Sequence, residues 1–227
     1  MPRSFDNLAR PYAVLEHLLF GRKLEQARDF HLEALDTRKP GKALILGEGD
    51  GRFTYKALHT NPKLSVDSIE QSFEMRRLAQ SRIEKLGNRG KDRYCQIKND
   101  ALQYSFPQNE YDFVITQFFL DCFRTENANQ LIVGINRALK VEGKFLYLDF
   151  SIPNGRSTYW LSHGLVAFLY LFFRATTNIE ARSLPLLSWP KSLEARSKRR
   201  LMKGLLTCET RTKILSRNQR TSLGSLS

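Results

Sequence analysis

The chain has 227 residues, of which 41% are apolar and 11% aromatic, so it can build a core and is not disordered. Its formal net charge of +13 would suit a nucleic-acid-binding protein, but the distribution of that charge weakens this interpretation. Residues 190–227 hold ten Lys or Arg against two Glu, whereas the remainder holds 26 basic against 21 acidic side chains. The excess belongs mainly to the C-terminal segment, and a basic tail is more often solubilising than specific.

Features of secreted, membrane-spanning or metal-binding proteins are absent from the sequence. It has no basic-then-apolar leader, and its longest apolar run, 164–173, falls well short of the roughly 20 residues of a membrane-spanning helix. The three cysteines are widely spaced without a C-x-x-C pattern, and the four histidines lack the spacing of metal ligands. We therefore expect a cytoplasmic protein with neither a disulfide framework nor a metal site.

The N-terminal region predicts helices. Apolar residues recur at helical spacing over 11–35, and a Lys-Pro-Gly turn follows at 39–41. We expect an N-terminal helical cap over 1–38, a central domain over 39–212 and a basic, disordered tail over 213–227.

From residue 42 onward, short apolar strands alternate with amphipathic helices. Strands are expected at 42–46, 64–70, 94–98, 112–118 and 144–150, and helices at 52–59, 73–86 and 126–140. Ser72 and Gly87 suit the N-cap and C-cap of the helix at 73–86. Strands that are apolar on both faces predict an α/β fold with a doubly wound, mostly parallel sheet covered on both sides.

The pattern changes after Pro153. Residues 158–175 predict one more helix, apolar nearly all round, and 193–210 predict an antiparallel hairpin that turns at Lys203-Gly204. The apolar run 164–173 suits a buried crossover helix. The alternative is a pocket wall or a peripheral membrane contact, since Tyr159, Trp160 and Arg174 flank it.

The stretch ALILGEGDGRF, residues 43–53, carries the strongest functional signal. Gly47, Gly49 and Gly51 directly follow a buried strand, where a doubly wound sheet binds its ligand, and glycine lets the backbone approach that ligand closely. No Gly-Lys-Ser/Thr triplet and no G-x-G-x-x-G spacing is present, and Glu48 and Asp50 would repel a pyrophosphate. The loop therefore favours a cationic ligand, although a plain strand-to-helix turn is the simpler alternative.

In ordered succession over about residues 40–152, the sequence resembles the class I S-adenosylmethionine (AdoMet)-dependent methyltransferases. LGEGDGRF is similar to the family's glycine motif, EYDFVITQFFLDCF to its fourth-strand motif, and RALKVEGKFLYLDF to its segment around the fifth strand. The resemblance implies AdoMet as cofactor. The cofactor-binding residues that it implies are Gly47, Glu48, Gly49, Asp50, Gly51, Glu70, Gln71, Asp100, Ala101 and Gln117.

Several of these residues have a simpler interpretation. Glu70, which would bind the ribose hydroxyls, could be a solvated strand-end carboxylate, and Asp100, near the adenine, could be a helix N-cap. The sequence also departs from the family pattern at Ile45, where an acidic residue is usual. Glu48 or Asp50 would take over part of that role.

Within the family, the closest resemblance is to the quinone-biosynthesis-like small-molecule methyltransferases, through FDNLARPY at 5–12 and the segment 170–185. It implies a small, hydrophobic or aromatic acceptor. Asp121, just past the fourth strand, is the candidate general base, with a helix cap as its equal alternative. Tyr12, Phe118 and His163 are the expected lining of the acceptor pocket.

Two other functions remain open at this point. One is an RNA methyltransferase that uses the basic tail as a phosphate-binding arm, although the QFFLDC segment argues against methylation of exocyclic base amines. The other is a binding protein that keeps the AdoMet fold without turnover, which the loss of the acid at Ile45 would suit.

Overall fold

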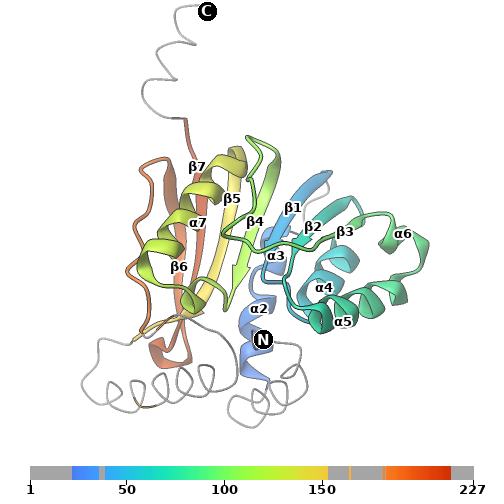
Figure 1. The fold of residues 1–227 in the computed structure, drawn as a ribbon, viewed down its shortest axis with the longest axis horizontal. Coiled ribbons are helices and arrows are strands. Elements are labelled where there is room, and N and C mark those ends of the chain that lie inside the picture. The colour runs from blue at the N-terminus through green and yellow to red at the C-terminus, as the bar shows by residue number, and fades with distance from the viewer. Residues whose placement is uncertain (1–21, 36–38, 153–163, 165–180, 182, 216–227) are drawn as a thin grey trace, which may run out of the picture.

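A computed structural model describes residues 22–35, 39–152, 164, 181 and 183–215 (Figure 1). It shows one seven-stranded sheet with the order β3-β2-β1-β4-β5-β7-β6. The first five strands in this order run parallel, and β7 and β6 are antiparallel to their neighbours. The predicted doubly wound α/β fold is confirmed, and so is the C-terminal hairpin, whose second strand, β7, inserts between β5 and β6.

The strands are β1 (Gly41–Leu46), β2 (Leu64–Ile69), β3 (Tyr94–Ile97), β4 (Tyr111–Gln117), β5 (Leu139–Phe150), β6 (Leu193–Leu201) and β7 (Leu206–Lys213). The α-helices are α2 (Lys23–Asp29), α3 (Leu32–Leu35), α4 (Arg52–Thr60), α5 (Phe73–Ile83), α6 (Asn88–Lys91) and α7 (Thr125–Ala138). Short 3-10 turns are η2 (Glu84–Leu86), η3 (Leu120–Cys122) and η4 (Met202–Gly204).

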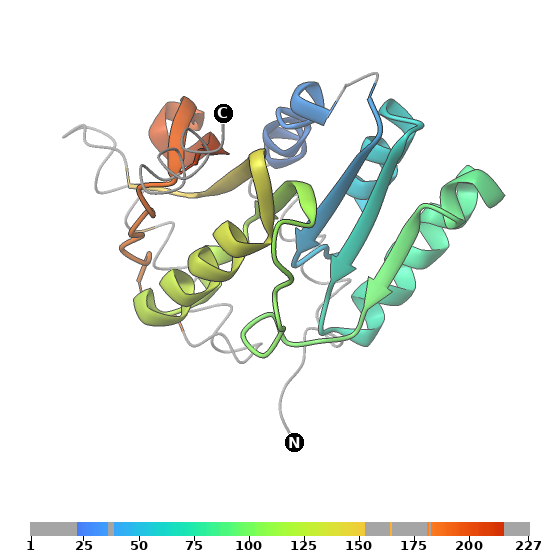
Figure 2. The same cartoon turned by 90° about the horizontal axis from the view of Figure 1, so that it is seen from above.

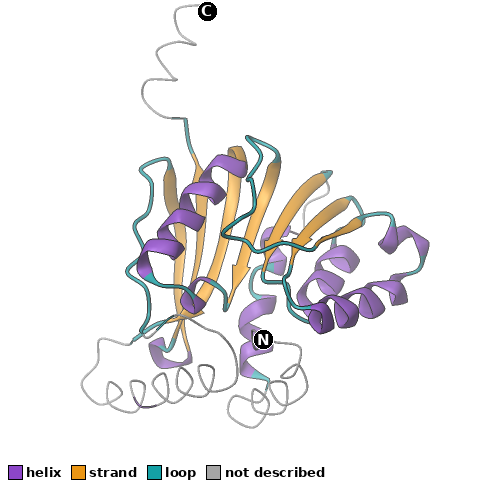
Figure 3. Cartoon of the chain, viewed as in Figure 1, coloured by secondary structure: helices purple, strands orange, loops and turns teal. Residues whose placement is uncertain are grey.

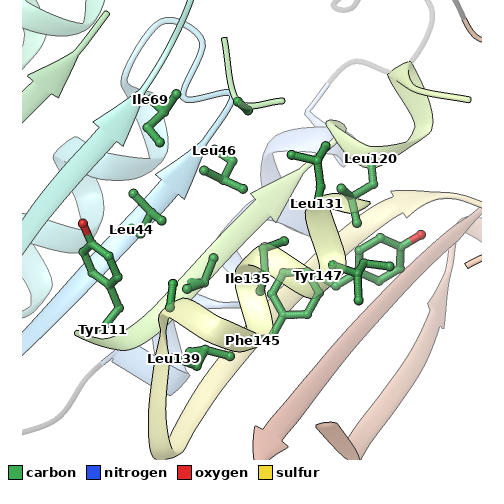
Figure 4. Close-up of a cluster of buried hydrophobic side chains, with 14 of the residues drawn as sticks. Leu44, Leu46, Ile69, Tyr111, Leu120, Leu131, Ile135, Leu139, Phe145 and Tyr147 are labelled. Carbon is green, nitrogen blue, oxygen red and sulfur yellow. The ribbon is translucent and has the colours of Figure 1, made fainter. Parts of the chain in front are cut away.

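Helices cover both faces of the sheet, as the apolar pattern of the strands requires (Figure 2). On one face α7 packs through Leu131 and Ile135 onto Leu44, Phe145 and other strand residues (Figure 4). On the other face α3, α4 and α5 bury Leu35, Leu58 and Ile83 against alternate residues of the same strands. Successive strand side chains point to opposite faces, so each central strand contributes to both cores.

Helix α2 rests on the C-terminal strands of the sheet. Leu24 and Ala27 of α2 share a small apolar cluster with Leu206 and Cys208 of β7. Lys56 of α4 also reaches α2, where it pairs with Glu25 and Asp29 at 2.7 Å each. The expected helices over 11–35 are confirmed only over the two described stretches, because residues 11–21 lie outside the described part of the chain.

Element boundaries differ from expectation at two places. The fifth strand begins at Leu139 rather than at residue 144, because Leu139 pairs with Tyr111 across a register shift in which Glu142 takes a φ of 64°. Helix α5 ends at Ile83 and continues as a 3-10 turn up to Gly87, whose φ of 69° caps it as expected. The Ser72 cap is also confirmed, since its hydroxyl accepts from the Met75 amide. The helix expected over 158–175 lies outside the described residues, apart from Gly164.

The topology fixes where a ligand would bind. From β1 the chain proceeds to β2 and β3 on one side and then returns to β4 and β5 on the other, so β1 and β4 form the switch point (Figure 1). Figure 3 shows the strands of this sheet in orange, in the same view. The carboxyl ends of these parallel strands share one edge of the sheet, which is the usual binding edge of doubly wound folds.

Candidate active site at the carboxyl edge of the sheet

The loop after β1 is held in a glycine-dependent conformation. Gly47, Gly49 and Gly51 have φ values of 68°, 65° and 79°. A Cβ at Gly47 would lie 2.2 Å from the Phe119 ring, and one at Gly51 would lie 2.7 Å from Cα of Ala79 on α5. A Cβ at Gly49 would meet nothing within 4 Å. Gly47 and Gly51 therefore allow close packing of the protein on itself, whereas Gly49 exposes backbone on the open side of the loop.

Glu70 connects this loop to the end of β2. Its Oε2 accepts from the Gly49 amide at 3.0 Å, and its Oε1 accepts from the Ser72 amide at 2.9 Å. Burial raises the pKa of Glu70, and these backbone hydrogen bonds oppose that effect. The next residue, Gln71, is exposed. The carboxylate is thus fixed beside Gly49, with lone pairs left for further donors.

Glu48 lies in the loop but is bonded toward α4. Its Oε2 accepts from the Thr54 hydroxyl, and its Oε1 is buried without a hydrogen-bond partner in the described structure. Burial raises the pKa of Glu48 to about 8, and the nearby Asp50 and Glu70 carboxylates add to the shift. Burial therefore disfavours a negative charge on Glu48.

Asp50 is held by two arginines. Its carboxylate accepts from Arg52 Nε at 3.1 Å and from Arg82 Nη2 at 3.1 Å, and Arg82 Nε also bonds the Asp50 carbonyl at 3.0 Å. These contacts tie the loop to α4 and α5. The Ile45 side chain, where the family pattern has an acid, is buried in the core beneath α4.

The segment after β3 forms a turn. Asp100 Oδ1 accepts from the Leu102 amide at 3.0 Å, and the Asp100 carbonyl accepts from the Gln103 amide. Ala101 is buried in the same core as Leu46 and Ile69, the last residues of β1 and β2. The turn therefore lies against the strands that carry the glycine loop and Glu70.

Gln117, the last residue of β4, is bonded to the N-terminal helices. Its Nε2 donates to the Arg28 carbonyl at 3.1 Å and lies 3.3 Å from His31 Nδ1, while His31 Nε2 lies 3.0 Å from Cys208 Sγ. Burial lowers the pKa of His31 to about 4, so this ring is neutral at pH 7. A neutral His31 that accepts at Nδ1 positions the Gln117 amide at the end of β4.

Aromatic side chains follow Gln117. Phe118 has a φ of 55°, and its ring lies 5.3 Å from that of Phe150, between centroids. Phe119 packs over Gly47 and lies 5.0 Å from the Phe123 ring in an edge-to-face arrangement. All four rings are only partly buried. The turn after β4 thus presents aromatic surface next to the glycine loop.

Asp121 lies in η3 beside a residue that sequence reasoning missed, Asp149. Asp121 is 8% exposed, and burial raises its pKa to about 6. Asp149, near the end of β5, is fully buried, and its Oδ1 accepts from the Phe119 amide at 2.8 Å. Burial and the Asp121 charge raise the pKa of Asp149 well above its usual range. A detectable signal was present, because an acid interrupts the apolar run of 145–150.

The Cys122 thiol is affected by carboxyl groups from both sides of this edge, Asp121 and Asp149 on one side and Glu70 on the other. Its Sγ lies 3.6 Å from Asp121 Oδ1, and burial together with the charges of Asp121, Asp149 and Glu70 raises the pKa of the thiol well above its usual value. The carboxyl groups of Glu70, Asp121 and Asp149 therefore all act on one side chain. Among the described residues, no group of three or more His, Cys, Asp or Glu is arranged to hold a metal ion. Tyr12 and His163, the other expected pocket residues, lie outside the described ranges.

Comparison with known proteins agrees with this geometry. Residues 43–143 match a family described as "Methyltransferase domain". The chain is 32% identical over 108 residues to the ubiquinone/menaquinone biosynthesis C-methyltransferase UbiE of Blochmanniella pennsylvanica. This alignment covers 48% of this chain and 41% of that protein. The chain is 28% identical over 151 residues to UbiE of Shewanella sp. strain ANA-3, with 66% and 58% covered. The chain thus spans roughly half the length of these relatives.

Residues 43–143, less than half of the chain, are thus similar to the methyltransferase domain of the class I AdoMet-dependent family. Solved structures agree with this fold. YcgJ from Bacillus subtilis matches with a TM-score of 0.59 at 13% identity, over 85% of this chain and 100% of that one. An O-methyltransferase family protein from Burkholderia thailandensis matches with a TM-score of 0.63 at 16% identity, over 87% and 61%.

AdoMet, the methyl donor of this family, fits the residues at the edge of the sheet. Gly49 presents backbone to open space, Glu70 offers a carboxylate beside it, and the loop has no lysine. This donor set suits a nucleoside that carries a positive charge better than it suits a phosphate chain.

Proposed function

We propose that the chain transfers the methyl group of AdoMet to a small, hydrophobic or aromatic acceptor. The observation that supports this most directly is the juxtaposition of the glycine loop and Glu70 with an aromatic turn that carries Asp121, all at one sheet edge. The methyltransferase domain supplies the reaction class. The acceptor class rests on the side chains after β4 and on the names of the relatives.

The cofactor would be held by groups on β1, β2 and β3. Backbone at Gly49 would approach the nucleoside, Glu70 would accept from its ribose hydroxyls, and the turn at Asp100-Ala101 with Gln71 would lie at the base. We assign Glu48 and Asp50 to the support of the loop, because their carboxylates are bonded to α4 and α5.

The acceptor would be held on the β4 and β5 side. When bound, AdoMet supplies an electrophilic methyl group with a good leaving group, so the residues of this chain mainly have to align the acceptor, which can lower the barrier by roughly 7–11 kcal/mol. Gln117, Phe118 and Phe119 would line the place where it binds. A hydroxyl or acidic carbon on the acceptor would lose its proton to Asp121, whose pKa of about 6 suits a base at neutral pH.

The acceptor class is tested by a turnover screen. The full chain is incubated with AdoMet and a panel of quinols, phenols and aliphatic alcohols, and S-adenosylhomocysteine release and product mass are measured. We expect turnover with aromatic acceptors, and its loss in Asp121→Asn. Turnover with none of the panel but intact binding of S-adenosylhomocysteine would favour the non-catalytic binding protein.

The structure gives RNA little support as the acceptor. Three basic side chains of the C-terminal segment already have partners within the chain: Lys198 and Arg211 contact Glu209 at 2.6 Å and 2.7 Å, and Arg199 stacks on Phe30 at 4.2 Å. A salt-dependent RNA shift would revive this alternative.

In the described part of the chain, no helix is long and apolar enough to cross a membrane.

A further inference from the structure

Two buried carboxyl groups meet where the acceptor is proposed to bind. Asp121 comes from η3 and Asp149 from β5. Burial penalises the ionised form of both and so raises the pKa of each carboxyl group. Described residues form no ion pair with Asp149. Two adjacent carboxylates of this kind rarely ionise together.

The two groups are not equivalent. Asp149 is 0% exposed and Asp121 is 8% exposed, so Asp149 is the more completely desolvated. Asp149 Oδ1 accepts from the Phe119 amide, whereas Asp149 Oδ2 is buried with no hydrogen-bond partner. The nearby backbone amides of Phe119, Leu120 and Asp121 lower the pKa of Asp149, but burial and the Asp121 charge raise it by more. A buried carboxylate oxygen without a donor is costly, whereas a protonated oxygen carries no net charge.

Among the described residues, the titratable groups that act on Asp149 and on its neighbour Cys122 include no positive charge. On η3 the titratable neighbours are Asp121 and Cys122, and beyond Cys122 lies Glu70 at the end of β2. Across the sheet Asp149 pairs with Thr207 of β7, which is uncharged. Asp121, Cys122 and Glu70 can each be only neutral or negative. Their charges therefore favour a proton on Asp149, which is the more buried of the two aspartates.

We infer that Asp149 is a neutral carboxylic acid that holds the turn after β4 through the Phe119 amide and leaves the negative charge of the pair to Asp121. Asp149 is thus a positioning residue. Its Oδ1 fixes the Phe119 amide, and the Phe119 ring rests on Gly47, so one side chain couples the acceptor side to the cofactor loop. The inference rests on the proposed function only in naming Asp121 as the proton acceptor.

The pair can be observed directly by carbon NMR of protein labelled at the aspartate carboxyl carbons, with Asp121→Asn and Asp149→Asn used for assignment. We expect the Asp121 signal to titrate near pH 6. The Asp149 signal should stay at its protonated position from about pH 5 to about pH 8. An Asp149 signal that titrates below about pH 5 would overturn the inference.

A pair of substitutions adds a second test. Asparagine mimics a protonated aspartic acid, so Asp149→Asn should leave the Asp121 midpoint within about half a pH unit and S-adenosylhomocysteine affinity within about twofold. Asp149→Ala removes the acceptor for Phe119 and should weaken that affinity about tenfold. If Asp149→Asn instead lowered the Asp121 midpoint by more than about one unit, Asp149 would have been charged. Wild-type protein that binds no S-adenosylhomocysteine would refute the proposed function and leave the carboxyl titration readable.

Discussion

The proposed cofactor side and the proposed acceptor side of this sheet edge are built differently. On the cofactor side each group follows its own strand directly: the glycines end β1, Glu70 ends β2, and Glu70 binds the Gly49 amide. On the acceptor side Asp121 comes from η3, after β4, and Asp149 comes from β5; burial raises the pKa of both, and the Asp121 charge adds to the shift of Asp149. Local sequence therefore specifies the cofactor side, whereas the acceptor side is specified only once the chain is folded.

The largest effect should come from the glycine that joins the cofactor loop to α5. Gly51→Val forces a β-branched residue to a φ of 79° and places its Cβ 2.7 Å from the Ala79 backbone. Left-handed strain of about 1–2 kcal/mol and overpacking of about 1–3 kcal/mol should together lower the free energy of unfolding in urea. Gly49→Ala is the matched control, because it adds strain without a contact. Equal losses in both variants would show that packing on α5 is unimportant.

The next effect lies under the acceptor side and depends on pH. His31 is buried and its pKa is lowered to about 4, so below its unfolded pKa of about 6.5 the unfolded chain binds a proton that the folded chain does not. The free energy of unfolding should fall by about 3 kcal/mol between these pH values. His31→Gln should lose this part of the pH dependence. Identical slopes in the two proteins would mean that His31 is protonated in the folded state.

A smaller effect separates binding from stability on the cofactor side. Glu70→Gln removes a charged acceptor and should weaken S-adenosylhomocysteine binding by about 1.5–3 kcal/mol, which is roughly ten- to a hundredfold. Glu74→Gln is the control, because Glu74 pairs with Arg77 on the outside of α5. Calorimetry measures both. Equal affinities in the two variants would remove Glu70 from the proposed site.

The smallest effect concerns the tether between α2 and α4. Lys56 pairs with Glu25 and Asp29, but all three side chains are about one-third exposed. Lys56→Ala should therefore lower the free energy of unfolding by no more than about 1 kcal/mol. Affinity for S-adenosylhomocysteine should not change. A large loss of affinity would mean that the position of α2 controls the cofactor side as well.

The sequence predicted most of the fold because each element carries its own pattern. The strands β1 to β4, the helices α4 and α7 and the hairpin at Lys203-Gly204 lie within a few residues of their expected places. The early start of β5 could not be predicted, since Leu139 belongs to the strand only through its pairing with Tyr111.

Less of the candidate site than of the fold could be predicted from the sequence. The positions of the glycines and Glu70 follow from strand ends, but a sequence cannot show which way a side chain turns. The sequence places Glu48 and Asp50 in the glycine loop. Only the structure shows that side chains of α4 and α5 bind their carboxylates. Asp149 stood in an apolar run without a recognisable motif, and its importance depends on an amide of Phe119 and a carboxyl of Asp121 that folding brings to it.

The central claim is that Gly49 and Glu70 bind a positively charged nucleoside instead of a phosphate chain. Calorimetric titration of the full chain with AdoMet, S-adenosylhomocysteine, ATP and NAD tests it most directly. We predict saturable binding of AdoMet and S-adenosylhomocysteine, weakened in Glu70→Gln, and no binding of ATP or NAD. Binding of ATP or NAD without binding of AdoMet would contradict the account.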